Sequence, residues 1–243
     1  MPDRTTQVYL LNVGNTNVEY AIAYNGVIGE VHSVPGKEFD FASVPADIPI
    51  AIACVVPSFI QKLKDLKASF FELKPGIDCG IDFSGFDISS MGADRLANLI
   101  YLAETGPVPA LCIDFGTAIT FEIMGAGKVF KGGAIMPGRM LQRKALNDFT
   151  ALLPCVPFYH DIPETGNGTV DSIRVGVDRG IIGGVKEIIA NTCNLFPGES
   201  LRIVAAGGDV EFFLKYISGL EAAGNNCTLY GINKAWEYYI NES

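Results

Sequence analysis

The sequence predicts an α/β protein made of two similar halves. A strand that ends in a polar residue, then a turn with glycine and threonine, then a second strand occurs at residues 9–17 and again at residues 110–124. The apolar run at 51–56 suits a buried parallel strand, and apolar residues with helical spacing follow it at 59–70. The Gly-Pro-Val-Pro segment at 106–109 is the best candidate linker. We therefore expect domains at residues 1–108 and 109–243.

The first half begins with an expected three-stranded meander. Its strands are predicted at residues 8–13, 17–24 and 27–33, and Asn25-Gly26 between the last two is a strong hairpin signal. An irregular segment rich in Gly, Asp and Ser spans residues 74–90 and leads into a helix expected at 94–104.

The second half repeats the order of strands, threonine-containing turn and helices. Strands are expected at 110–113, 118–124, 128–130 and 201–206, and helices at 139–147, 170–195, from Asp209 to 216, and 232–240. The long helix contains four glycines, each of which costs about 1 kcal/mol relative to alanine. Such a density of glycine indicates the close approach of another backbone, either within the chain or from a second copy.

Composition excludes several classes of protein. An apolar fraction of 49% among 243 residues suffices for a large core, and a net charge of −9 argues against a nucleic-acid groove. No apolar run approaches the roughly 18–20 residues that span a bilayer, and residues 1–7 lack a signal-peptide pattern. We therefore expect a cytoplasmic protein without a membrane partner.

Cysteine and histidine offer no catalytic or metal pattern. The six cysteines show no CxxC spacing, so we expect reduced thiols and neither a disulfide framework nor a zinc site. The two histidines, His32 and His160, lie far in sequence from the two turns, so a histidine base is not expected.

The two turns suit phosphate binding. Glycine lets backbone N–H groups approach an anion, a hydroxyl adds a donor, and a nearby acid can hold the accompanying cation. These residues are Asn12, Gly14, Asn15 and Thr16 in the first turn, and Asp114, Gly116 and Thr117 in the second. One such turn alone is equally an ordinary hairpin with a polar turn. Two copies favour a single triphosphate held between them.

Four motifs in order give a closer match. GADR at 92–95, DFGTAIT at 114–120, GGAIMPG at 132–138 and TALLP at 150–154 resemble the type III pantothenate kinases of the acetate and sugar kinase, Hsp70 and actin superfamily. The resemblance implies two RNase-H-like (actin-like ATPase) domains that face a nucleotide cleft. It also implies the ATP-dependent phosphorylation of pantothenate to 4′-phosphopantothenate, the first step of coenzyme A biosynthesis.

The resemblance also assigns roles to individual residues. Asp94 would be the general base, although alone it could simply cap its helix, and Arg95 could be a solvated charge. Gly92, Ala93 and Arg95 would contact pantothenate, and Thr169 would reach the pantothenate of the other subunit in a homodimer with shared sites. Asp114 would hold a monovalent cation, K⁺ or NH₄⁺, and Gly207-Gly208 would cover the adenosine. Without the resemblance, Gly207-Gly208 is equally a tight strand-to-helix turn.

Two positions depart from the family. Asn12 stands where the family has aspartate, so Mg²⁺ at the first turn would be held by an uncharged amide. Phe86, or else Phe83, stands near the place of a tyrosine close to the pantothenate pocket. These changes leave open a slow kinase, or a catalytically silent member that acts as a binding or regulatory protein. A third reading is a phosphoryl transferase of the same fold acting on a different hydroxyl.

Overall fold

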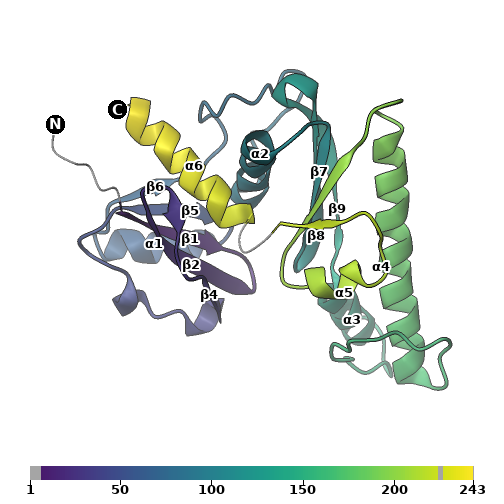
Figure 1. Cartoon of the computed structure of the whole chain (residues 1–243). Helices are drawn as coiled ribbons and strands as arrows, with labels where there is room; N and C mark the ends of the chain where they lie inside the picture. Colours follow the sequence, from purple (N-terminus) through teal and green to yellow (C-terminus); the bar gives the residue numbers. More distant parts are fainter. Residues whose placement is uncertain (1–6, 224–226, 243) are drawn as a thin grey trace. The chain divides into compact units, whose positions relative to one another are not determined.

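A computed structural model describes residues 7–223 and 227–242, and Figure 1 shows their elements. Residues 1–7 were expected to lack a signal peptide, and of these only Gln7 lies within the described residues. The chain divides into two compact units. Unit 1 comprises Met1–Val108, Met124–Lys131 and Gly224–Ser243, and unit 2 comprises Pro109–Ile123 and Gly132–Ala223. The last helix therefore belongs to unit 1, whereas the sequence suggested a second domain running from 109 to 243.

Unit 1 is built on a sheet with the strand order β3-β2-β1-β5-β6, in which β4 also pairs with β2. The strands are β1 (Gln7–Val13), β2 (Asn17–Tyr24), β3 (Val27–Ile28), β4 (His32–Pro35), β5 (Ile50–Cys54) and β6 (Phe70–Glu72). β2 runs antiparallel to β1, while β5 is parallel to both β1 and β6. This mixed sheet belongs to the first of the two expected α/β halves.

Helices cover both faces of this sheet. They are α1 (Pro57–Asp65), α2 (Ala93–Thr105) and α6 (Cys227–Glu242). α1 packs on the face that carries Leu11 and Val13, whereas α2 and α6 pack on the face that carries Leu10 (Figure 1). Alternate side chains of β1 therefore enter different cores, as its near-continuous apolar sequence requires. α6 lies so close to α2 that a Cβ on Gly231 would collide with the backbone of Ala97.

Unit 2 repeats the topology of unit 1. Its sheet has the order β11-β10-β7-β8-β9, which matches β6-β5-β1-β2-β3 strand for strand. The strands are β7 (Ala110–Phe115), β8 (Ala118–Gly125), β9 (Val129–Pro137), β10 (Arg202–Ala206) and β11 (Glu221–Ala222). The helices are α3 (Arg139–Asp148), α4 (Thr169–Cys193) and α5 (Val210–Leu214). The repeated strand order confirms the expected α/β fold with two related halves.

Three expected elements were wrong in detail. The helix predicted at 59–70 ends at Asp65, because Lys67 has a positive φ of 55° and Phe70 begins β6 beside β5. The strand predicted at 27–33 is broken into β3 and β4, both of which pair with β2. The strand predicted at 128–130 continues as β9 to Pro137, so GGAIMPG is mostly strand. Among the described residues, none of the helices has the length and apolar character needed to cross a bilayer.

Candidate active site

The first predicted phosphate turn closes the β1–β2 hairpin. Asn12 is the penultimate residue of β1, and Gly14, Asn15 and Thr16 connect the two strands. The Gly14 N–H donates to the carbonyl oxygen of Asn17 at 3.0 Å, and the Gly36 N–H donates to the carbonyl of Thr16 at 2.8 Å. Asn15 and Thr16 are exposed. The turn is thus fixed by backbone bonds, and its tip is accessible to an anion.

The Asn12 side chain has an acidic partner across the hairpin. Asn12 is directly opposite Glu19 in β2, and its Nδ2 donates to Glu19 Oε2 at 3.0 Å. Both side chains are half-buried. A carboxylate is therefore present beside the first turn, although not at position 12.

The GADR segment begins α2 on the same face of the sheet as Asn12. Asn12 is two residues beyond Leu10, and Ala93 packs in the same core as Leu10. A Cβ on Gly92 would lie 3.6 Å from Cγ1 of Val55, the residue that directly follows β5. The start of α2 is therefore near the carboxyl end of β5, and β5 is the parallel neighbour of β1.

Asp94 lies in the first turn of α2. Its Oδ1 accepts the N–H of Arg95 at 2.8 Å, and both side chains are half-buried. A carboxylate is electrostatically favoured at this end of a helix. Gly92 leaves room for it, since a Cβ there would lie 2.5 Å from Asp94 Oδ1. The carboxylate is thus positioned by the helix start and remains partly accessible.

The second predicted turn is tightly packed within unit 2. Gly116 and Thr117 join β7 to β8, and the Gly138 N–H donates to the carbonyl of Thr117 at 2.9 Å. A Cβ on Gly138 would collide with the carbonyl oxygen of Gly116 and lie 2.7 Å from that of Thr117. Gly138 therefore packs against the turn between β7 and β8.

Asp114 and the Gly207-Gly208 turn come together in the same unit. Gly207 has a positive φ of 94°, and a Cβ there would collide with Asp114 Oδ1 and lie 2.7 Å from the backbone of Phe115. The Asp209 N–H donates to the carbonyl of Phe115 at 3.1 Å. The structure therefore brings the expected adenosine turn next to the expected cation ligand. Burial raises the pKa of Asp209, and the nearby Arg139 acts in the opposite direction.

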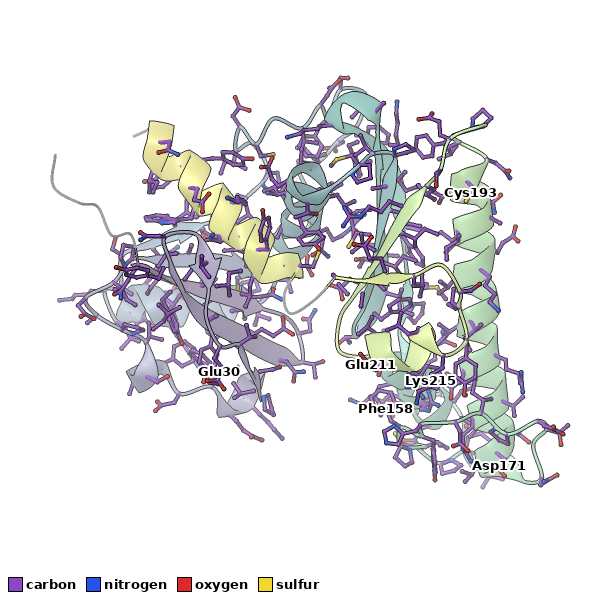
Figure 2. The ribbon with its side chains drawn as sticks, viewed as in Figure 1. Glu30, Phe158, Asp171, Cys193, Glu211 and Lys215 are labelled. Carbon is purple, nitrogen blue, oxygen red and sulfur yellow. The ribbon has the colours of Figure 1, made fainter. Side chains whose placement is uncertain are left out.

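Two arginines of α3 surround one buried carboxylate of α4. Asp178 exposes 0% of its surface and accepts from Arg139 Nε at 2.9 Å and from the Arg143 guanidinium at 2.9 Å with both oxygens. Arg139 also approaches Asp209 Oδ1 at 3.5 Å, and its guanidinium lies 4.9 Å from the ring of Phe158, which Figure 2 labels. Arg139 directly follows Gly138, so this network connects the second turn, the Gly207-Gly208 turn and α4.

The remaining predicted residues are Phe86 and Phe83 of unit 1 and Thr169 of unit 2. Phe86 and Phe83 place their rings 4.8 Å and 5.7 Å from that of Phe130 in unit 1, and Phe86 is 43% exposed. Both rings therefore pack against Phe130. Thr169 is the exposed first residue of α4 in unit 2, two positions before Asp171, which Figure 2 labels.

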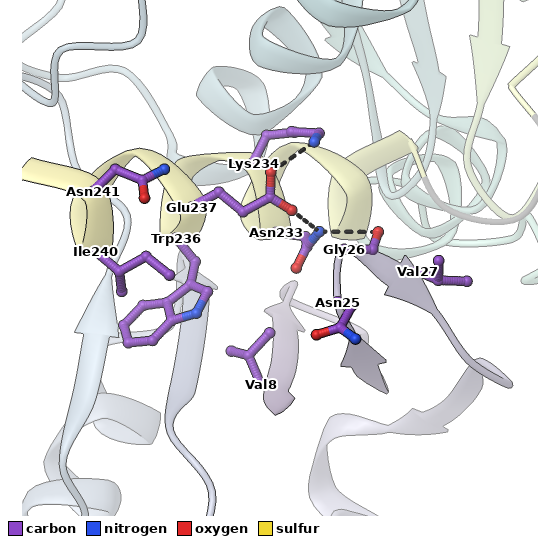
Figure 3. Close-up of a pocket in the computed structure, with 10 residues that line it drawn as sticks. All are labelled: Val8, Asn25, Gly26, Val27, Asn233, Lys234, Trp236, Glu237, Ile240 and Asn241. Atoms are coloured by element: carbon purple, nitrogen blue, oxygen red, sulfur yellow. Dashed lines mark hydrogen bonds and ion pairs between the residues drawn. The ribbon is translucent and has the colours of Figure 1, made fainter. Parts of the chain in front are cut away.

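A separate hollow of about 520 Å³ in unit 1 contains none of the predicted site residues. It lies between α6 and the β2–β3 turn and is lined by Trp236, Glu237 and Asn233 among others (Figure 3). Asn233 Nδ2 bonds both Glu237 and the carbonyl of Gly26, so the polar groups there hold the hairpin to the helix.

The described residues contain no group of three or more His, Cys, Asp or Glu side chains arranged to hold a metal ion. Magnesium bound to a nucleotide does not need such a cage. It usually keeps several waters and takes one or two carboxylates together with phosphate oxygens. The hard oxygen donors beside the two turns fit that chemistry.

Comparison with known proteins places the chain in a family. The family model described as type III pantothenate kinase matches residues 9–191. The type III pantothenate kinase of Legionella pneumophila (strain Corby) is 35% identical over 173 residues, which is 68% of each chain. That of Listeria monocytogenes (strain EGD-e) is 30% identical over 201 residues, covering 80% of this chain and 77% of the relative. The chain belongs to the type III pantothenate kinases.

Solved structures show the same fold for this pantothenate kinase family member. A Campylobacter jejuni protein described as a Baf family transcriptional activator matches 96% of this chain and 99% of its own, with a TM-score of 0.64 at 20% identity. The activator of the 2-hydroxyisocaproyl-CoA dehydratase from Clostridium difficile, solved with bound ADPNP, matches 98% and 95% with a TM-score of 0.52 at 11% identity. These similarities support the fold, with two RNase-H-like domains of the actin-like ATPase type.

The surroundings of the predicted turns also contain residues that sequence reasoning missed. Glu19 had a usable signal, because a hairpin closed by residues 14–16 pairs position 12 with position 19. Arg139, Asp178 and Asp209 had none. They are separated by 39 and 31 residues, and nothing local in the sequence predicts that their side chains meet.

Proposed function

We propose that this chain transfers the γ-phosphoryl group of ATP to the primary hydroxyl of pantothenate, producing 4′-phosphopantothenate in the first step of coenzyme A biosynthesis. The observation that carries the proposal is the position of Asp94. A half-buried carboxylate starts α2 on the sheet face that also carries Asn12 beside the first phosphate turn. A proton acceptor and a phosphate site on one face are what phosphoryl transfer to a hydroxyl requires.

In this proposal the two turns hold the phosphates. We assign phosphate binding to the exposed residues Asn15 and Thr16 of the first turn and Thr117 of the second, while Gly14 and Gly116 shape these turns. Phosphoryl transfer has a loose transition state, so catalysis is mainly positioning and neutralisation of charge. Asn12 beside the first turn would help to hold the Mg²⁺ that accompanies ATP, and this ion would supply positive charge that an acidic chain lacks.

Other side chains complete the proposed site. Asp94 accepts the proton of the attacking hydroxyl, and Arg95, with the backbone of Gly92 and Ala93, binds pantothenate. Asp114 would hold a monovalent cation, K⁺ or NH₄⁺, and the neighbouring Gly207-Gly208 turn, where a Cβ on Gly207 would collide with Asp114, would cover adenosine. Phe86 contributes only apolar contact to pantothenate, because it lacks a hydroxyl. The reaction takes place in the cytoplasm, where ATP is supplied.

We further propose a homodimer that shares its sites, with Thr169 reaching the pantothenate of the other subunit. The glycines of α4 support this. A Cβ on Gly176, Gly180 or Gly183 would meet no described atom within 4 Å, whereas one on Gly184 would touch Met136 at 3.3 Å. Packing among the described residues therefore does not explain three of the four helix glycines. Large exposed apolar residues of unit 2 provide further contact area, namely Ile135, Phe149 and Leu152.

The test is ATP consumption by the purified chain with and without pantothenate, in potassium and in sodium buffer, with the product identified by mass spectrometry. We expect pantothenate-dependent ADP formation that is faster in potassium. ATP binding without any pantothenate-dependent turnover would instead support the silent, regulatory member that Asn12 left open. Turnover with a different hydroxyl compound only would support the third alternative.

A further inference from the structure

The carboxylate that position 12 lacks is present on the neighbouring strand. Glu19 faces Asn12 directly across the β1–β2 pair, and the amide nitrogen of Asn12 donates to it at 3.0 Å. Since a carboxylate only accepts hydrogen bonds, the amide must present its nitrogen to Glu19, so its oxygen is directed away from that bond. The pair thus offers amide and carboxylate oxygens at one place.

The pair lies at the end of the hairpin where the phosphate turn begins. The next residues toward the turn are Val13 and Val18, which pair with each other and enter the opposite core. Asn12 and Glu19 therefore continue the row of side chains that packs under α2, and they are the last pair of that row before residues 14–16. Both are half-buried, whereas the tip of the turn is exposed.

We propose that Glu19 supplies the negative charge for the Mg²⁺ ion that accompanies ATP at the first turn, and that the Asn12 amide holds Glu19 in position. The inference rests on the proposed function, because it takes the ligand of this turn to be a magnesium nucleotide. One carboxylate suffices for such an ion, since waters and phosphate oxygens complete its shell. In this chain Glu19 of β2 thus supplies the negative charge that the family aspartate supplies at the position of Asn12 in β1.

The alternative is that the Asn12–Glu19 bond only stabilises the hairpin, and charge-neutral substitution separates the two roles. Glu19→Gln keeps an oxygen that can accept the Asn12 amide but removes the charge. Asn12→Asp combined with Glu19→Gln restores one charge and lets the hydrogen bond run in the opposite direction. Glu30→Gln is the matched control, because Glu30 is an exposed acid of unit 1 outside the strands and is labelled in Figure 2.

ATP affinity of the full chain should be measured by calorimetry in EDTA and over a series of Mg²⁺ concentrations. We expect Glu19→Gln to weaken the Mg²⁺-dependent affinity by about 10–100-fold, the range found when groups around a bound metal are removed. Affinity in EDTA should stay the same, the double variant should recover most of the loss, and Glu30→Gln should behave as the unmodified chain. Mn²⁺ binding in the presence of ATP, followed by electron paramagnetic resonance, should show the same order.

Pantothenate turnover of the unmodified chain is measured beside these titrations. If the chain phosphorylates pantothenate and Glu19→Gln keeps the full magnesium dependence, the inference is wrong and the function stands. If Glu19→Gln loses the magnesium dependence but pantothenate is never phosphorylated, Glu19 keeps its role and the function is wrong. An equal loss in EDTA and in Mg²⁺ would also overturn the inference, because it would show that the Asn12–Glu19 pair is only structural.

Discussion

The buried ion-pair network of unit 2 leads to a quantitative prediction for Asp178→Asn. This substitution preserves the shape of the side chain but removes the charge shared by Arg139 and Arg143, which are 3% and 0% exposed. It also replaces an accepting oxygen with an NH₂ group that faces a guanidinium donor. Leaving buried charges without their partner costs about 3–5 kcal/mol. Against a total stability of about 5–15 kcal/mol for a domain, this loss is large.

The assay is urea unfolding followed by far-UV circular dichroism, which reports on α3 and the 25-residue α4. The control is Asp161→Asn. Asp161 pairs with Arg174 at 3.0 Å, but its side chain is 83% exposed, so its loss should cost no more than about 1 kcal/mol. If Asp178→Asn loses as little stability as this control, the reasoning about the buried network is refuted.

Two further predictions concern glycines of unit 2. Gly138→Ala places a Cβ against the carbonyls of Gly116 and Thr117, and such overpacking costs about 1–3 kcal/mol. Because the turn must shift to make room, ATP binding measured by calorimetry should weaken roughly tenfold. Unchanged affinity would show that the turn does not bind phosphate. Gly180→Ala should stabilise a separate chain by about 1 kcal/mol but shift the dimer toward the 26.1 kDa monomer in light scattering. A Gly180→Ala variant that remains fully dimeric would place the interface elsewhere. If the sites are shared, mixed dimers of Thr169→Ala and Asp94→Asn chains should recover part of the activity that each variant loses alone.

The sequence was most informative where a pattern is local. The repeated strand–turn–strand signal located both turns, and the apolar spacing after GADR predicted α2 within one residue of its bounds at each end. Asn25-Gly26 correctly marked the β2–β3 hairpin, with Asn25 at a positive φ of 48°. These signals succeed because hairpin turns and helix faces are determined by residues near one another in the chain.

Prediction was weaker where tertiary contacts decide the structure. Phe70 continues the helical spacing of residues 59–70, but the parallel edge of β5 was available and residues 70–72 became β6. Likewise, α6 follows unit 2 in sequence, yet it packs against α2 in unit 1, where Thr228 Oγ1 donates to buried Asn98 at 2.9 Å. Long-range partners of this kind leave no periodic trace in the sequence.

The candidate site divides in the same way. Asp94, Asn12 and Thr117 were predicted from motifs, and the structure places each at the start of a helix or beside a turn. The supporting residues were not predicted, since Arg139 pairs with Asp178 of a different helix. Glu19 is intermediate, because strand register alone would have revealed it as the partner of Asn12.

The most direct test of the central claim is a parallel measurement of turnover and ATP binding for Asp94→Asn. A base acts on the substrate proton and not on the nucleotide, so pantothenate phosphorylation should fall by about 10²–10⁴-fold while the Kd for ATP stays within about threefold. Asp65→Asn, at the end of α1 on the opposite face of the unit 1 sheet, should leave both unchanged. Substantial turnover by Asp94→Asn, or a loss of ATP binding equal to its loss of turnover, would contradict the account.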